Sequence, residues 1–149
     1  MTRVAFLLIA HAAVTWFLTG LIWTIQVVHY PLFEMADRAR YAVFANMHNL
    51  RITPLVGPPM VVEAVLALWL VVDRPPGIPA WWTWAGLALV VAIWLSTIFL
   101  QVPAHGRLAT AFDADAHRLL VGTNWLRTAA WTGRALLASV LLARVVGPR

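Results

Sequence analysis

Four long apolar stretches dominate this 149-residue sequence and restrict the folds open to it. They cover roughly residues 4–28, 53–72, 81–102 and 119–146. Each is long enough for a transmembrane helix, which needs about 20 mostly apolar residues. Because the bilayer core offers the backbone no hydrogen-bond partners, such segments must be helical. The sequence therefore predicts an all-α integral membrane protein, a four-helix bundle in which the spans run up-down-up-down.

The composition supports this class and excludes others. Hydrophobic residues make up 62% of the chain and charged residues 11%, whereas about a quarter of a soluble domain is charged. The net charge is +5, but the arginines are scattered among apolar spans, which argues against nucleic-acid binding. There is no Cys, so a disulfide, a thiolate nucleophile and a Cys-ligated metal are excluded. No small-residue cleavage site follows the first stretch, so we expect a retained span rather than a signal peptide.

The chain resembles itself when it is shifted by 76 positions. Uncommon residue types then coincide: His29 with His105, Asp37 with Asp113, Arg51 with Arg127, and Gly57 with Gly133. This pattern favours tandem duplication of a helical hairpin, with one copy at 4–72 and the other at 81–146 of a single membrane domain, 1–149. Two spans per copy leave both copies in the same orientation and both termini on one side. Two unrelated hairpins with similar edges would also look somewhat alike, and that alternative stays open.

Polar side chains recur on one face of three of the spans. At about 3.6 residues per turn, each of these sets shares a helix face: His11, Thr15, Thr19, Gln26 and His29; Trp94, Thr97 and Gln101; Asn124, Arg127, Thr128, Trp131 and Arg134. Lipid cannot satisfy these groups, so we expect the polar faces to meet inside the bundle.

Three charges lie inside the apolar stretches, at Glu63, Arg127 and Arg134. A charge at the bilayer centre costs at least ~2.5–3.5 kcal/mol, so such residues usually have partners. Glu63 and Arg134 differ in depth by about 7 Å at 1.5 Å per residue, which an Arg side chain can cover. We predict a buried Glu63–Arg134 pair and treat both as candidate catalytic residues. Glu63 could act as a proton carrier or general base, although pairing with Arg134 would oppose that role.

Four of the five histidines gather at one predicted end of the bundle: His29, His48, His105 and His117. Imidazole is the commonest metal ligand in proteins. His29 and His105 could clamp a transition metal (Cu, Fe or Zn) or a haem iron, and His48 and His117 could add ligands. Two alternatives stay open. Interfacial histidines can simply bond headgroups and helix ends, or they can act in acid–base catalysis without a metal.

Arg51 and Arg127 lie at the same predicted end as the histidines. They could bind an anionic group, such as a haem propionate, a carboxylate or a lipid phosphate. Gln26, Gln101 and Asn124 could orient the same ligand, and we include them as cofactor-binding candidates. For the amides the alternative role is an interhelical bridge, and for the arginines it is snorkelling to water.

Two segments carry a resemblance to known proteins: TGLIWTIQVVHYPLF at 19–33 and TNWLRTAAWTGR at 123–134. In these segments and in its general layout the chain resembles small bacterial four-span membrane proteins of the anthrone oxygenase-like family. The resemblance implies a bacterial inner membrane and the oxygenation of a flat, apolar aromatic substrate, without requiring a bound metal. It identifies no catalytic residue in this chain.

These features together predict an integral membrane oxidoreductase or oxygenase with a His- and Arg-lined site. The site would hold a metal or haem and a lipid-soluble, aromatic or quinone-like molecule. The main alternative is a non-enzymatic carrier or subunit that binds a lipid, an ion or a partner helix. A third possibility is a proton path along the polar face of the first span. It would require a homo-oligomer, because four helices leave little room for a pore.

Overall fold

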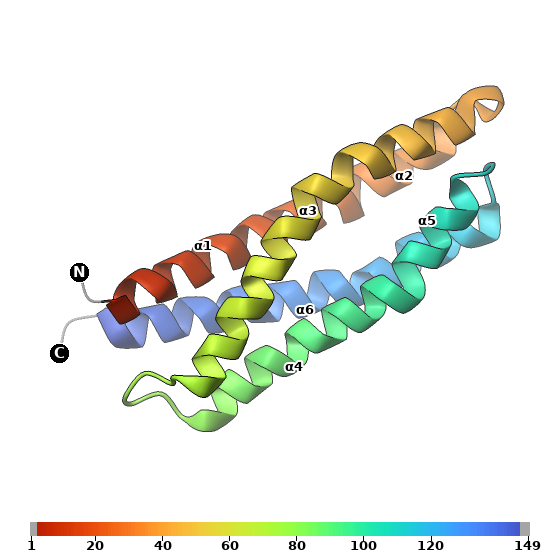
Figure 1. The fold of residues 1–149 in the computed structure, drawn as a ribbon. Helices are drawn as coiled ribbons and strands as arrows, with labels where there is room; N and C mark the ends of the chain where they lie inside the picture. Colours follow the sequence, from red (N-terminus) through yellow and green to blue (C-terminus); the bar gives the residue numbers. More distant parts are fainter. Residues whose placement is uncertain (1–2, 147–149) are drawn as a thin grey trace.

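A computed structural model describes residues 3–146, which form helices and turns and contain no strand (Figure 1). The chain forms four helical rods, at residues 3–35, 38–72, 80–108 and 114–146. Three of them, Arg3–Met35, Arg38–Val72 and Ala80–Leu108, are long and apolar enough to cross a membrane. The all-α class is therefore confirmed, and helices of membrane-spanning length are present.

Each rod consists of α-helical elements and of short π or 3₁₀ turns, which are labelled η. The first contains α1 (Arg3–Thr24), η1 (Ile25–His29), α2 (Tyr30–Leu32) and η2 (Phe33–Met35). The second contains η3 (Arg38–Arg40) and α3 (Tyr41–Val72). The third contains α4 (Ala80–Ser96), η4 (Thr97–Gln101) and α5 (Val102–Leu108), and the fourth is α6 (Ala114–Val146).

The first and third rods each widen into one π turn, η1 and η4, shortly before a proline. A proline ring clashes with the carbonyl four residues earlier. That carbonyl belongs to Val27 for Pro31 and to Phe99 for Pro103, and both residues lie in the π turn. The wider turn gives the carbonyl room, so the helix passes the proline without ending. Such π turns are frequent at functional sites.

The second rod begins earlier than the sequence pattern predicts. The apolar stretch starts near residue 53, whereas α3 runs unbroken from Tyr41 and has Pro54, Pro58 and Pro59 in its interior. Figure 1 shows that α3 changes direction in its gold-to-yellow part, so its first half follows the first rod and its second half crosses toward α4. Interior prolines are a usual cause of such a bend. Residues 41–52, which lie between the first two apolar stretches, thus belong to α3.

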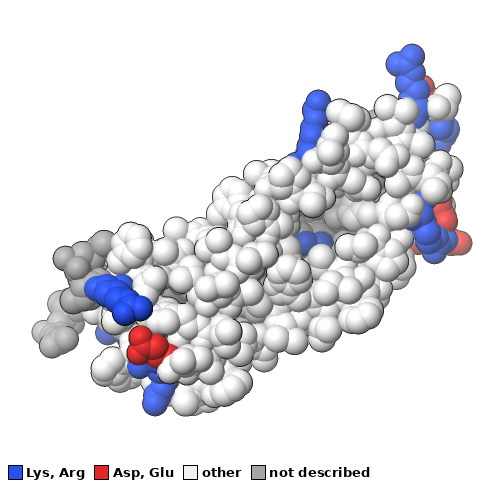
Figure 2. All heavy atoms as spheres, viewed as in Figure 1, with Lys and Arg blue, Asp and Glu red and all other residues white. Residues whose placement is uncertain are grey.

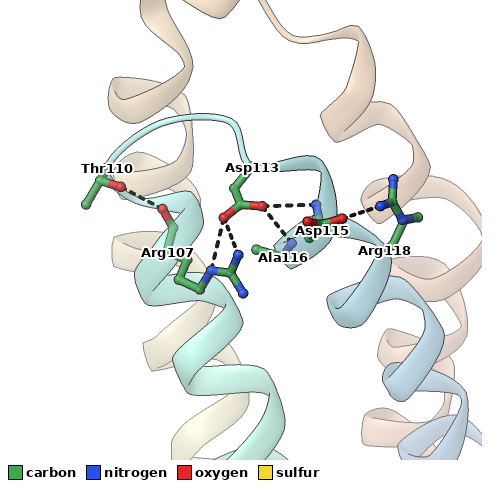
Figure 3. Close-up of polar contacts among 6 residues, drawn as sticks. All are labelled: Arg107, Thr110, Asp113, Asp115, Ala116 and Arg118. Carbon is green, nitrogen blue, oxygen red and sulfur yellow. Dashed lines mark hydrogen bonds and ion pairs between the residues drawn. The ribbon is translucent and has the colours of Figure 1, made fainter.

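The turn between α5 and α6 is held by Asp113 (Figure 3). Its Oδ1 atom accepts hydrogen bonds from the backbone N–H groups of Asp115 and Ala116, both at 3.0 Å. Its Oδ2 atom accepts from the guanidinium of Arg107 on α5. This is an N-cap for α6. The cap fixes the third rod against the fourth at the end of the bundle that carries the histidines.

The core consists of three apolar clusters along the bundle. The first, near the histidines, includes Tyr30, Phe33, Tyr41, Leu108 and Leu120. The second includes Leu18, Ile22, Met60, Ile93 and Trp131, and the third includes Leu8, Leu70, Ile78 and Leu141. α6 contributes to all three and packs against both α1 and α4. These contacts shield the polar side chains of α6, which carries more buried polar side chains than any other rod.

The surface charges are unevenly distributed (Figure 2). On the face drawn there, most charged side chains lie at the two ends of the elongated molecule, and the flank between them is largely uncharged. Large apolar side chains are exposed along the rods, among them Phe6, Trp23, Val65, Leu95 and Phe99. An apolar flank between charged ends is the surface expected of a protein that spans a bilayer.

Candidate functional site

A cavity of about 440 Å³ opens between α3 and the rod formed by α4, η4 and α5. Much of its wall is apolar and comes from Ile25, Ile52, Val56, Met60, Trp94 and Val102. Its polar lining consists of Tyr30, Asn49, Thr53, Thr97, Gln101, His105 and Arg127. Figure 2 shows a hollow in the flank with cationic atoms at its floor, and Arg127 is the cationic residue of the lining. An apolar cavity with a few polar groups is typical of a small-molecule site.

Arg127 is the charged group of this cavity, and it is buried, with a relative exposure of 6%. In the described part of the chain no carboxylate forms an ion pair with it. One terminal nitrogen donates to Asn124 Oδ1 at 3.3 Å, and the guanidinium lies 5.1 Å from the centre of the Trp131 ring. Its Nε atom has no hydrogen-bond partner among residues 3–146. A buried cation without a counter-charge is costly, so this position favours an anionic or strongly accepting ligand.

Gln26 and Asn124 hold Arg127 in place. Gln26, which lies in η1, donates from Nε2 to the Val121 carbonyl at 3.2 Å. Asn124 donates from Nδ2 to Gln26 Oε1 at 2.8 Å, and its own oxygen accepts from Arg127. The structure thus brings together three of the predicted cofactor-binding residues. Only Arg127 of the three lines the cavity, so the two amides act as positioning groups.

Gln101, a fourth predicted residue, also lies at the cavity. It ends the π turn η4 and donates from Nε2 to the Thr123 hydroxyl at 2.8 Å. Both predicted glutamines therefore come from π turns and bond to α6.

Three of the four predicted histidine ligands form a chain from the cavity outward. His105 Nε2 and the hydroxyl of Tyr30 share a hydrogen bond of 3.0 Å at the cavity wall. The His48 ring stacks on that of His105, with centroids 5.3 Å apart. His29 Nε2 then lies 2.9 Å from His48 Nδ1. His117 stands apart, because its Nε2 donates to the Tyr30 carbonyl at 2.8 Å.

This arrangement does not resemble a metal centre. The ring nitrogens of His29 and His48 bond to each other, and His105 bonds to Tyr30, so they do not converge on one point. The other nitrogen of His117 faces the carboxylate of Glu34 at 3.2 Å. Among residues 3–146 no group of three or more His, Asp or Glu side chains could hold a metal ion. The geometry therefore gives no support to the predicted metal or haem.

Arg51 does not join Arg127. It is exposed on α3 and is absent from the cavity lining. The lining residues nearest to it on α3 are Asn49, Ile52 and Thr53. Successive helical residues are rotated by about 100°, and the packing of α3 turns Arg51 away from the bundle.

The predicted pair of Glu63 and Arg134 is confirmed. Glu63 Oε1 accepts from Arg134 Nε at 2.8 Å, and its Oε2 accepts from Trp131 Nε1 at 2.9 Å. The terminal nitrogens of Arg134 donate to the Gly86 carbonyl at 2.5 Å and to His11 Nε2 at 2.9 Å. The network joins α1, α3, α4 and α6, and Glu63 and Arg134 lie outside the 440 Å³ cavity. This geometry favours an anchoring role over a catalytic one.

Tyr30 is the site residue that sequence reasoning missed. It is 3% exposed, and its hydroxyl reaches the cavity from the short helix α2. The available signal was its place between His29 and Pro31, at the end of the polar face of the first span. That signal is weak, because tyrosines are also common at membrane interfaces.

Comparisons of this chain with models of protein families, with curated proteins and with solved structures find no match. The function must therefore be argued from the cavity and its residues.

Proposed function

We propose that the protein is a four-span integral membrane protein that binds a lipid-soluble small molecule in the 440 Å³ cavity. The rods would cross the bilayer up-down-up-down, with both termini on one side, in the inner membrane of a bacterium. The observation that supports the binding proposal most directly is Arg127, a buried cation on the wall of a largely apolar cavity. An anionic or carbonyl oxygen of the ligand would accept hydrogen bonds from its guanidinium.

The rest of the cavity suits a flat, apolar body. Small-molecule cavities usually enclose about 300–1,000 Å³, and this one is of that size. Trp94 offers an aromatic surface, and Ile52 and Val56 offer aliphatic contacts. A quinone-like or phenolic molecule combines such a body with the oxygen that Arg127 requires.

Substitution of Arg127 tests this proposal. The probe is a hydroxynaphthoquinone, which is anionic at neutral pH, titrated into purified protein while tryptophan fluorescence is recorded. Arg127→Gln removes the charge, and loss of a charged hydrogen bond costs about 1.5–3 kcal/mol, which is about 10- to 150-fold in Kd. Arg51→Gln, the matched control outside the cavity, should bind as the unmodified protein does. Equal affinity of the Arg127→Gln variant would contradict the proposal.

A second candidate is an enzyme that oxidises or oxygenates the bound molecule. The observation in its favour is the Tyr30–His105 pair on the same cavity wall as Arg127. His105 could accept a proton from a phenol or hydroquinone, and Arg127 could stabilise the resulting oxyanion. Oxygen uptake with a lipid-soluble hydroquinone, lost in His105→Ala while binding persists, would support it. Binding without turnover would favour a carrier, and metal analysis with a visible spectrum would test the metal or haem prediction.

A further inference from the structure

We infer that the ligand enters the cavity sideways from one leaflet of the bilayer, through an opening between α3 and α5. Its natural ligand is then a membrane-resident amphiphile with an apolar body and an acidic or phenolic head. This inference rests on the proposed function and adds to it the source of the ligand and the route of entry.

The opening lies on the flank of the molecule. Thr53 on α3 and Val102 and Gly106 on α5 line the cavity, and all three are exposed. In Figure 2 the hollow lies partway along the elongated molecule and not at its tip. With the rods along the membrane normal, a hollow on the flank faces lipid.

Entry from the aqueous end is blocked by the first apolar cluster. Phe33, Tyr41 and Leu108 belong to this cluster and are 0% exposed. Phe33 also packs edge-on against His29 and His48, with ring centroids 5.2 and 5.1 Å apart. These side chains close the bundle above the cavity, so a ligand from water would have to displace them.

The charged residues of α3 indicate the depth of the opening in the membrane. Arg51 is exposed on the flank, and Asp73 follows the last residue of the helix, so the two are 22 residues apart (73 − 51). At 1.5 Å per residue this is about 33 Å, close to the ~30 Å of a hydrocarbon core. Arg51 and Asp73 therefore mark the two boundaries of the apolar region. Thr53 lies just inside the boundary at Arg51.

The polarity of the cavity changes along the membrane normal in the same direction as the polarity of the leaflet. Along α3 it extends from Asn49, outside the Arg51 boundary, to Met60, which is about 16 Å deeper at 1.5 Å per residue. His105 lies at the outer end and Trp94 lies deeper. An amphiphile in the leaflet holds its head outward and its apolar body inward, so it can enter without turning over.

Two glycines give a matched pair of variants for the experiment. An added Cβ at Gly106 or at Gly122 would meet no heavy atom within 4 Å. Both are exposed positions near the histidine end, but only Gly106 lines the cavity. Gly106→Phe should therefore place a ring in the opening without displacing the core. Gly122→Phe adds the same ring on α6, away from the opening.

The test measures how fast an alkylated hydroxynaphthoquinone, preloaded into phosphatidylcholine vesicles, quenches the tryptophan fluorescence of the reconstituted protein. We expect Gly106→Phe to slow association at least about ten-fold and Gly122→Phe to leave it unchanged. Thr53→Trp, on the α3 side of the opening, should reproduce the slowing if Gly106→Phe fails to fold.

The outcomes separate this inference from the proposed function. Association at the normal rate in Gly106→Phe and Thr53→Trp, with binding still lost in Arg127→Gln, would overturn the lateral route and leave the cavity proposal intact. Normal binding in Arg127→Gln would overturn both. Faster entry of the unalkylated quinone from water than of the alkylated one from vesicles would also overturn the lateral route.

Discussion

Two arginines seven positions apart on α6 have opposite surroundings. The guanidinium of Arg134 is matched by Glu63, the Gly86 carbonyl and His11. The guanidinium of Arg127 has no carboxylate partner in the described part of the chain and faces a cavity. Both are buried. A buried charge requires a partner. Arg134 has its partners within the bundle, and the absence of a carboxylate beside Arg127 is the basis for proposing that it binds a ligand.

Removal of Glu63 should destabilise the protein strongly. Glu63→Ala leaves the Arg134 charge and the Trp131 N–H without their acceptor, and breaking a buried pair costs about 3–5 kcal/mol. Denaturation of the purified protein in mixed detergent micelles would measure the loss. The double variant Glu63→Leu with Arg134→Met removes both charges and should recover much of the stability. A loss below about 1 kcal/mol in Glu63→Ala, the range of exposed ion pairs, would contradict the anchoring role.

At the scale of single elements, prolines and caps shape the site. The bend of α3 lies where Pro54, Pro58 and Pro59 interrupt its hydrogen bonding, and the cavity opens beside this part of the helix. The π turns η1 and η4 direct Gln26 and Gln101 toward α6. Local irregularities in otherwise continuous helices therefore accompany the cavity: one π turn supplies Gln101 to its lining, and the other supplies Gln26 to the group that holds Arg127.

The start of α6 should depend on Asp113 and on pH. The N–H of Ala116, and next the guanidinium of Arg107, hold the pKa of Asp113 below its usual value. A lowered folded pKa means that the stabilisation is complete above the unfolded value of about 3.9 and is lost as the pH falls through the folded value. Asp113→Ala should lower the thermal midpoint at pH 7, and the difference from the unmodified protein should shrink in acid.

Asp115 provides the control for that experiment. It lies two residues further along, is exposed, and pairs with Arg118 in the same turn. Exposed pairs of this kind contribute little, so Asp115→Ala should have a much smaller effect on the midpoint. Equal effects of the two substitutions would show that charge near the helix start matters and that the cap of Asp113 does not.

At the scale of the whole molecule, the bundle is longer than a bilayer core is thick. α6 contains 33 residues, which is about 50 Å at 1.5 Å per residue, against a hydrocarbon thickness of ~30 Å. In the proposed four-span arrangement, with Arg51 at one boundary of the apolar region, the end with the histidines and the Asp113 turn would extend into the headgroup layer or beyond it. That arrangement would place the cavity across the boundary between water and lipid, where amphiphiles concentrate.

Labelling of single cysteines tests this placement, because the chain contains no Cys. A membrane-impermeant maleimide should react with Asp115→Cys from one side of sealed vesicles and with Arg74→Cys only from the other. Leu95→Cys, which is exposed on the apolar flank, should stay unlabelled until detergent is added. Reaction of Asp115→Cys and Arg74→Cys from the same side would contradict the four-span arrangement.

Much of this architecture is encoded in local patterns. Stretches of apolar residues predicted the helices, and the cost of burying charge in lipid predicted that Glu63 would form an ion pair with Arg134. The grouping of the histidines at one end followed from their positions along the helices. These inferences succeed because helix type and depth depend on the rise per residue and on hydropathy, which are properties of the chain alone.

The composition of the site was decided by packing in three dimensions. The sequence pattern grouped Arg51 with Arg127 at one end of the bundle as candidates to bind an anionic group, and it did not single out Tyr30. The structure exposes Arg51 and brings Tyr30 to His105. The rotation of each helix about its axis and the bend of α3 set which side chains face the cavity. Both result from contacts between residues far apart in the sequence, so depth along the membrane can be predicted from the chain, but the neighbours of a side chain cannot.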